Sequence, residues 1–424
     1  MEKTAFNAGL LEFLDAACTP FHAASELAER LLAAGYRDLA AGGIGEIAAG
    51  DGVFLRQGGS IVALRAGAGP VADRGLRMVG AHTDSPCLMV KPTPEIETSA
   101  YSQLGVQVYG GALLNPWFDR DLSLAGRVSF LRGDGAVATE LVDFRTPLAV
   151  VPSLAIHLDR EANKNRTINP QTDMAVVLGL QGDNSPSLRE RLAGRLRDAG
   201  ADVDEVLDFE LCFYDTQPAA EIGIDSEFIA SARLDNLLSC YIGLQALLGS
   251  EPGEWALLVC NDHEEVGSLS STGAQGPMLR EFLRRIPGFG DSLAAVMARS
   301  MLISADNAHG VHPNYRDKHD AAHGPLLNGG PVIKVNASQR YASDSEGAGL
   351  FRVLAREVDV PVQSFVVRAD MACGSTIGPI SAGELGVTTL DIGVPTFAMH
   401  SIRELAGVDD LNYLCRALQA FLNQ

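Results

Sequence analysis

The chain has 424 residues, of which 33 are Lys or Arg and 53 are Asp or Glu, so its formal net charge is −20. With 46% hydrophobic residues it can bury one large or two ordinary cores, which excludes a small disulfide-held scaffold and a largely disordered chain. Such an acidic chain, with no run of Lys or Arg, repels anionic surfaces, so we expect neither nucleic acid nor a membrane as a partner.

The cysteines and the N-terminal segment indicate the cellular compartment in which the protein is expected. The seven cysteines are scattered without a C-x-x-C pair, so we expect reduced thiols and no thiolate zinc site. The N-terminal segment has acidic residues among its apolar ones and lacks the basic and apolar regions of a secretion signal. No apolar run approaches the roughly 18 residues that a membrane-spanning helix needs. We therefore predict a cytoplasmic protein.

The first third of the chain predicts helices followed by strands. Apolar residues at three- and four-residue spacing predict two helices within 4–34, interrupted near Thr19-Pro20 because proline breaks the backbone ladder. Residues 52–82 show short β-like runs separated by glycine-rich turns. We expect a meander there that ends in a buried strand.

Residues 94–228 differ from the sequence on both sides. Alternating segments joined by turn residues predict a β-rich unit with one helix at 187–199. After it, helical and strand patterns alternate, beginning with a helix at 234–250 and ending with a helix at 409–422. This alternation predicts an α/β fold with a mixed, largely parallel sheet flanked by helices. We expect one α/β domain made of 1–93 and 229–424, with 94–228 inserted in it as a β-rich domain.

Candidate functional residues lie where predicted elements begin or end. His82 and Asp84 follow the strand RMVGAH, and a carboxylate near a histidine can fix the tautomer of a metal-binding ring. Glu264 and Glu265 follow the apolar strand WALLVC, where one carboxylate can bind a metal while the other acts as general base. The alternatives are a structural histidine and a solvated acidic turn.

Three further residues complete the set. Asp235 opens a predicted helix, where it could equally be an N-cap. Asp306 ends the strand MLISAD, and strand-end carboxylates face the ligand crevice of α/β sheets. His400 lies near a strand-to-helix junction. Together His82, Asp235, Glu265, Asp306 and His400 supply oxygen and nitrogen ligands that suit two divalent ions, with zinc expected first and manganese or cobalt left open.

The order of several long motifs resembles one peptidase family. GAHTDSP, SARLDN, DHEEVGS, DNAHGVHPNY, GPVIKVN, QRYASD, CGSTIGPI and FAMHSIRE look like the M18 aspartyl aminopeptidases over nearly the whole chain. The resemblance implies that Asp235 bridges two metals, that His82, Glu265, Asp306 and His400 complete their ligands, and that Glu264 is the general base. It implies that Asp84 orients His82.

The resemblance also implies substrates and assembly. Family members remove single N-terminal residues, often Asp or Glu, from peptides. They use a histidine from the inserted domain of a neighbouring subunit, for which His157 is the candidate, with a role in cross-strand packing as the alternative. The resemblance implies that 1–93 and 229–424 form the catalytic domain and that 94–228 is the domain through which copies assemble. A large closed homo-oligomer is implied, namely a dodecamer built from dimers.

An acidic substrate side chain requires a cation, because an unpaired buried carboxylate is costly. Lys334 lies inside an apolar strand and is our candidate, with snorkelling at a sheet edge as the alternative. His312 and Asp370 are further candidates for substrate binding. The stretch 368–374 differs from the sequence that the resemblance would imply for eukaryotic members, so the strictness of the acidic preference stays open. A broader or neutral preference and a non-catalytic assembly role are the alternatives. We interpret the Gly-Ser-Thr-Ile-Gly-Pro run as a loop whose N–H groups contact substrate.

Overall fold

The computed structural model describes residues 2–40, 45–97, 100–182, 185–290 and 293–424. The chain forms two compact units. The first comprises Met1–Ser85, Ala219–Met399 and Glu404–Gln424, and the second comprises Pro86–Pro218 with His400–Arg403. Along the chain, the boundaries between these units fall at 85/86 and 218/219. The predicted domain boundaries at 93/94 and 228/229 stay a prediction.

A nine-stranded mixed sheet forms the centre of the first unit, in the order β1-β2-β3-β13-β4-β14-β18-β16-β17. Neighbours run parallel except for β2-β3, β3-β13 and β18-β16. The predicted α/β class with a mixed, largely parallel sheet is confirmed. The strands are β1 (Arg37–Asp38), β2 (Gly52–Gln57), β3 (Ser60–Arg65), β4 (Arg77–His82), β13 (Ala256–Asn261), β14 (Met301–Ala305), β16 (Val332–Val335), β17 (Gln363–Val366) and β18 (Thr388–Gly393).

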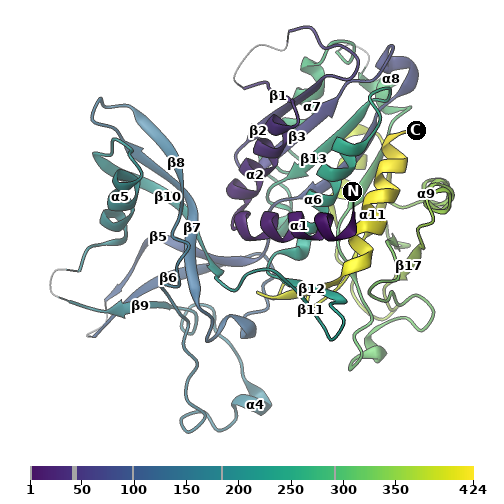
Figure 1. The fold of residues 1–424 in the computed structure, drawn as a ribbon. Coiled ribbons are helices and arrows are strands. Elements are labelled where there is room, and N and C mark those ends of the chain that lie inside the picture. The colour runs from purple at the N-terminus through teal and green to yellow at the C-terminus, as the bar shows by residue number, and fades with distance from the viewer. Residues whose placement is uncertain (1, 41–44, 98–99, 183–184, 291–292) are drawn as a thin grey trace. The chain divides into compact units, whose positions relative to one another are not determined.

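Helices cover both faces of this sheet (Figure 1). Alternation along each strand divides its side chains between two cores, as in β3, where Ile61 and Ala63 face one core and Val62 and Leu64 face the other. Among the described residues, no helix combines the length and apolarity needed to cross a membrane. The helices are α1 (Lys3–Ala16), α2 (Pro20–Ala33), α6 (Leu234–Gly249), α9 (Ser345–Glu357) and α11 (Val408–Leu422) on one face, and α3 (Val71–Arg74), α7 (Met278–Arg285) and α8 (Leu293–Met297) on the other.

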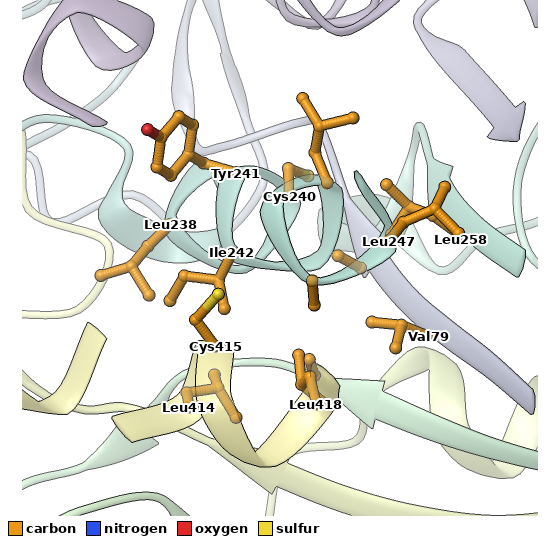
Figure 2. Close-up of a cluster of buried hydrophobic side chains, with 14 of the residues drawn as sticks. Val79, Leu238, Cys240, Tyr241, Ile242, Leu247, Leu258, Leu414, Cys415 and Leu418 are labelled. Atoms are coloured by element: carbon orange, nitrogen blue, oxygen red, sulfur yellow. The ribbon is translucent and has the colours of Figure 1, made fainter. Parts of the chain in front are cut away.

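Helix α6 is buried between the sheet and α11. Figure 2 shows Ile242 of α6 beside Leu414 and Cys415 of α11, with Val79 of β4 and Leu258 of β13 contributing from the sheet. A helix that is apolar around most of its surface is typical of a core position. The residues at the start of α6 are therefore held against the sheet from which other candidate ligands emerge.

A five-stranded sheet in the first unit was not anticipated from the sequence. Its order is β11-β12-β20-β19-β15, and its strands are too short for a recognisable alternation. They are β11 (Ala220–Ile222), β12 (Phe228–Ser231), β15 (Ala308–His309), β19 (Pro395–Phe397) and β20 (Glu404–Gly407). The strands β12 and β20 pair antiparallel, with Ser231 opposite Glu404.

The interpretation of Gly374–Pro379 as a loop was wrong in its second half. Helix α10 (Ile377–Leu385) begins there, and the Thr376 hydroxyl accepts a hydrogen bond from the N–H of Gly378 at 3.3 Å. A threonine cap supports the start of a helix, and Pro379 lies in the first turn, where its missing N–H would have no helical partner. Only the residues before Thr376 remain as a loop.

The second unit is built on a six-stranded antiparallel sheet, in the order β8-β7-β10-β5-β6-β9. Helix α5 (Leu188–Asp198), close to the predicted 187–199, packs Leu192 and Leu196 into its core and begins with a capping box of Ser187 and Glu190. The other elements are β5 (Cys87–Glu97), β6 (Tyr101–Tyr109), η1 (Asn115–Trp117), β7 (Leu122–Leu131), β8 (Val137–Asp143), α4 (Ala162–Asn165), β9 (Val176–Leu180) and β10 (Glu205–Asp215).

Candidate metal centre

The adjacent parallel strands β13, β4 and β14 end at the same edge of the nine-stranded sheet. His82 is the last residue of β4, and Asp306 directly follows β14. Glu264 and Glu265 lie in the short 3-10 helix η2 (Glu264–Val266) after β13. Because carboxyl ends of parallel strands converge on the ligand crevice, the sheet topology brings these residues together.

Asp235 reaches the same edge from the start of α6. Its backbone is not helical (φ −82°, ψ 105°), and the residue at the N-cap position is Arg233, whose side chain makes no capping hydrogen bond. An N-cap role stays the alternative prediction for Asp235, because the residue before a helix also has non-helical backbone angles. The Asp235 side chain is buried, with Oδ1 3.3 Å from Nε2 of His82.

His82 is at the centre of the cluster. Its Nε2 lies 3.6 Å from Oδ1 of Asp306 and 4.0 Å from Oε2 of Glu264. Within the first unit, two groups of three have ligand atoms within 4.8 Å of one another: His82, Asp235 and Asp306, and His82, Glu264 and Glu265. The cluster is made of oxygen and imidazole donors, the ligands that suit zinc and related ions.

The Nδ1 atom of His82 lies 3.0 Å from the main-chain oxygen of Asp84. Because a carbonyl oxygen only accepts, Nδ1–H is the donor, and Nε2 is left to face the carboxylates of Asp235 and Asp306. Burial alone would lower the pKa of His82, but the carboxylates of Asp235, Asp306 and Asp84 raise it well above its usual value. The carboxylates around His82 therefore favour its protonated form when no metal is bound.

The Asp84 carboxylate holds the turn that carries both glutamates. Its Oδ1 accepts the N–H of Glu264 at 3.1 Å, and its Oδ2 accepts the N–H of Glu265 at 3.0 Å. Asp84 is fully buried, and its Oδ1 also lies 3.4 Å from Nδ1 of His82. The Asp84 carboxylate thus connects the end of β4 with η2. This contact comes in addition to the predicted role of Asp84 in orienting His82.

The cluster has an excess of negative charge. Burial raises the pKa of Glu264 to about 8, with further contributions from the carboxylates of Asp306, Glu265 and Asp235. Several carboxylates this close repel one another unless protons or cations lie between them. The donor chemistry and this charge both fit divalent cations, so His82, Asp235, Glu264, Glu265 and Asp306 are suited to surround them.

We expect zinc binding to release protons at pH 7. We expect His82 and Glu264 to hold protons in the metal-free chain, because the pKa of His82 is raised well above its usual value and that of Glu264 to about 8. A metal requires a neutral imidazole and ionised carboxylates. Zinc titrated calorimetrically into the metal-free protein, in buffers of different ionisation enthalpy, is expected to release about one to two protons per chain. Glu264→Gln is expected to release about one fewer. Heats that do not depend on the buffer would contradict this protonation state.

Two of the predicted histidines, His157 and His400, belong to the second unit. The Nδ1 of His400 lies 3.2 Å from the carbonyl oxygen of Gly111, so Nδ1–H donates there. His157 lies in an exposed turn outside the strands, which excludes a role in cross-strand packing. The apolar residues around it, Leu154, Ile156 and Leu158, are also exposed.

The first unit contains a cavity of about 290 Å³ lined by His309, the predicted His312, Lys318, His319 and Arg368, among others. The predicted Asp370 does not line it, but pairs with Arg368 at 2.6 Å. His309 was not among the residues predicted to bind substrate. Burial and the ammonium group of Lys334 lower the pKa of His309, while the carboxylates of Asp235 and Asp306 act in the opposite direction. His309 thus connects the metal-ligand cluster electrostatically with this cavity.

Lys334 is buried in β16 and does not snorkel to the surface. Its Nζ lies 3.1 Å from Oδ2 of Asp306, donates to the carbonyl oxygen of Asn307 at 3.1 Å, and lies 5.1 Å from the ring centroid of Tyr341. The ammonium group therefore contacts a candidate metal ligand directly. Any anionic group that approaches Asp306 from this side meets a positive charge.

Comparison with known proteins shows the family to which the chain is similar. The family model described as "Aminopeptidase I zinc metalloprotease (M18)" matches residues 13–422. A probable M18 family aminopeptidase 2 of Ectopseudomonas mendocina (strain ymp) is 59% identical over 416 residues, covering 97% of both chains. The cryo-EM structure of the Ape4 and Nbr1 complex contains a chain that is 37% identical, with a TM-score of 0.94 over 99% of this chain and 86% of that one. The mApe1 dodecamer of S. cerevisiae is 26% identical, with a TM-score of 0.84 over 99% and 96%.

Proposed function

Because the chain belongs to the M18 family of zinc aminopeptidases, it is a metallopeptidase, and we propose that it holds two zinc ions and removes single, preferentially acidic residues from the N-termini of peptides. The observation that carries the proposal is the buried cluster around His82 with Glu264 at its side. His82, Asp235, Glu265, Asp306 and His400 would hold the ions, and Asp235 is the residue that we propose both ions would share.

Zinc at this site would supply Lewis-acid activation of water and of the scissile carbonyl group. The residues of the chain have separate roles. Glu264 accepts the proton of the attacking water at a carboxylate oxygen and transfers it to the leaving amine. Asp84 keeps both η2 glutamates in place through their N–H groups. The pKa of Glu264 is about 8 without metal, and it would be lower beside bound cations, so the carboxylate could then act as a base near neutral pH.

The acidic preference rests on Lys334 and the adjacent cavity. An N-terminal Asp or Glu carries its side-chain carboxylate close to the cleaved bond, and therefore close to the metal ligands. The Lys334 ammonium beside Asp306 is the buried cation nearest to these ligands by the contacts above, and Lys318 and Arg368 add positive charge to the cavity. A substrate carboxylate bound there would be paired, which removes the main cost of burying it.

Replacing Lys334 by methionine is expected to lower kcat/KM for Asp- and Glu-peptides about 10- to 100-fold more than for Leu- and Ala-peptides, since a hydrogen bond to a charged group is lost. Kinetics on peptides that differ only in the N-terminal residue measure this ratio, and Lys318→Met is the matched control. An equal fall on all four peptides would mean that Lys334 acts only through Asp306. A preference that moves with Lys318→Met instead would place recognition in the cavity.

We further propose a homo-oligomer, a dodecamer built from dimers, in which His157 of one copy serves the metal centre of a neighbour. The exposed turn of His157 and its exposed apolar neighbours support this, because a single copy leaves them without cover. His157 would donate a hydrogen bond to the oxyanion that forms during attack.

A mixing experiment tests the shared site. His157→Ala and Glu264→Gln are each expected to be nearly inactive alone. If the two variants are dissociated and reassembled together, some sites combine an intact Glu264 with a neighbour's intact His157. Activity of up to roughly a quarter of the wild-type value is then expected if each site draws on two copies at random. No recovery despite mixed oligomers, or a monomer by light scattering, would contradict the proposal.

A further inference from the structure

The main chain at Asp235 is held by side chains from distant parts of the first unit. The N–H of Asp235 donates to Oε2 of Glu404 at 2.8 Å, and its carbonyl oxygen accepts the hydroxyl of Ser85 at 2.6 Å. The side-chain amide of the next residue, Asn236, donates to the carbonyl oxygen of Ala305 at 2.9 Å. These contacts fix a segment that the helix itself does not, because Asp235 and Asn236 have non-helical backbone angles.

Glu404 reaches Asp235 because of strand pairing. In the five-stranded sheet Glu404 lies opposite Ser231 of β12, and the chain runs from Ser231 directly into the segment that carries Asp235. Only 3% of Glu404 is exposed. A buried carboxylate is costly, and accepting a backbone N–H offsets part of that cost.

The segment before Asp235 is fixed as well. The Arg233 guanidinium donates to the carbonyl oxygens of Leu14 and Ala17, at the C-terminal end of α1, at 3.0 and 3.2 Å. With neighbours on both sides anchored, the direction of the Asp235 carboxylate depends on the two hydrogen bonds to its own peptide groups. One of these ends on Glu404, which the metal-ligand assignment does not include.

We infer that Glu404 is a positioning residue for the metal centre: its carboxylate oxygen, together with the Ser85 hydroxyl, sets the direction from which Asp235 meets the metal ions. The inference rests on the proposed metal role of Asp235. The position of the Glu404 carboxylate oxygen, and not its charge, is then what orients Asp235. A partner of this kind orients a ligand, and its loss usually weakens metal binding about 10- to 100-fold.

Two substitutions of Glu404 distinguish the effect of the position of its carboxylate oxygen from the effect of its charge. Glu404→Asp keeps the charge but withdraws the oxygen by one methylene, whereas Glu404→Gln keeps an oxygen at the same length without the charge. Zinc affinity of the full-length, metal-stripped protein is measured by competition with a chromogenic chelator. Glu404→Asp is expected to weaken binding of at least one zinc ion about 10- to 100-fold, and Glu404→Gln less than about threefold.

Asp410 provides a matched control for lost stability. Its buried carboxylate also accepts backbone N–H groups, from Asn328 at 2.6 Å and Gly330 at 2.7 Å, but it contacts none of the metal-ligand residues named above. Asp410→Asn is expected to shift the thermal midpoint of the metal-free protein without changing zinc affinity. Wild-type zinc affinity in Glu404→Asp would overturn the inference, as would equal weakening in Glu404→Asp and Glu404→Gln.

Failure of the inference can be distinguished from failure of the proposed function. If the wild-type protein binds zinc and hydrolyses peptides while Glu404→Asp binds zinc normally, only the role of Glu404 is wrong. If the wild-type protein binds no zinc, the metal role of Asp235 fails and the inference falls with it. Weakened zinc binding in Glu404→Asp, with a thermal midpoint of the metal-free variant equal to that of the wild-type protein, would support a displaced ligand over a general loss of folded protein.

Discussion

Replacing Glu264 by glutamine is expected to lower peptide hydrolysis about 10²- to 10⁴-fold, the usual contribution of a general base. Glutamine preserves the shape of the side chain but cannot accept the proton of the attacking water. Zinc content is expected to stay at the wild-type level, because Glu264 is not among the proposed ligands. Turnover of an N-terminal Asp peptide, together with zinc analysis of the same preparation, provides both values.

The matched control is Glu265→Gln, one residue along the same short helix. Both N–H groups are held by the Asp84 carboxylate, so the two variants disturb the backbone to a similar extent. Glu265→Gln is expected to lose zinc as well as activity. The geometry makes this comparison necessary, because Glu264 and Glu265 both have carboxylate oxygens within 4.8 Å of a His82 ring nitrogen. Loss of zinc in Glu264→Gln with retention in Glu265→Gln would reverse the two roles.

Asp235→Asn is expected to reduce bound zinc from two ions per chain to one or none. The amide removes the negative charge that a bridging ligand supplies to both ions, and leaves His82 and Asp306 for one of them. Activity is expected to fall about 10³-fold, equivalent to several kcal/mol of lost electrostatic stabilisation. Without metal, the variant is expected to unfold at a temperature no lower than that of the wild-type protein, because the substitution removes one negative charge from a cluster of carboxylates that repel one another. Two tightly bound zinc ions in this variant would contradict a bridging role.

Residues at the ends of long apolar strands could be predicted from the sequence. WALLVC before Glu264 and MLISA before Asp306 are both recognisable as buried strands, and strands of one parallel sheet end at the same edge. The fold class and the convergence of His82, Glu264, Glu265 and Asp306 follow from that rule. The resemblance to the M18 family added roles that these patterns alone left open, such as the choice for Asp235 between metal ligand and helix cap.

Features that depend on short elements and distant contacts could not be predicted. The strands β12, β15, β19 and β20 have two to four residues, too few to show a period, yet they place Glu404 beside Asp235. The start of α10 was missed because Gly378 and Pro379 suggest a loop, although Thr376 is a suitable cap. The contact of Lys334 with Asp306 joins residues 28 apart through a sheet register that the sequence does not reveal.

The most direct test of the account measures release of the N-terminal residue from Asp-, Glu-, Leu- and Ala-peptides by the wild-type protein, before and after removal of metal by a chelator and again after zinc is restored. We predict that Asp and Glu are released fastest, that chelation abolishes hydrolysis of all four peptides, and that zinc restores it. Faster release of Leu or Ala than of Asp or Glu would contradict the acidic preference alone. Full activity after complete removal of metal would contradict the proposed metal centre itself.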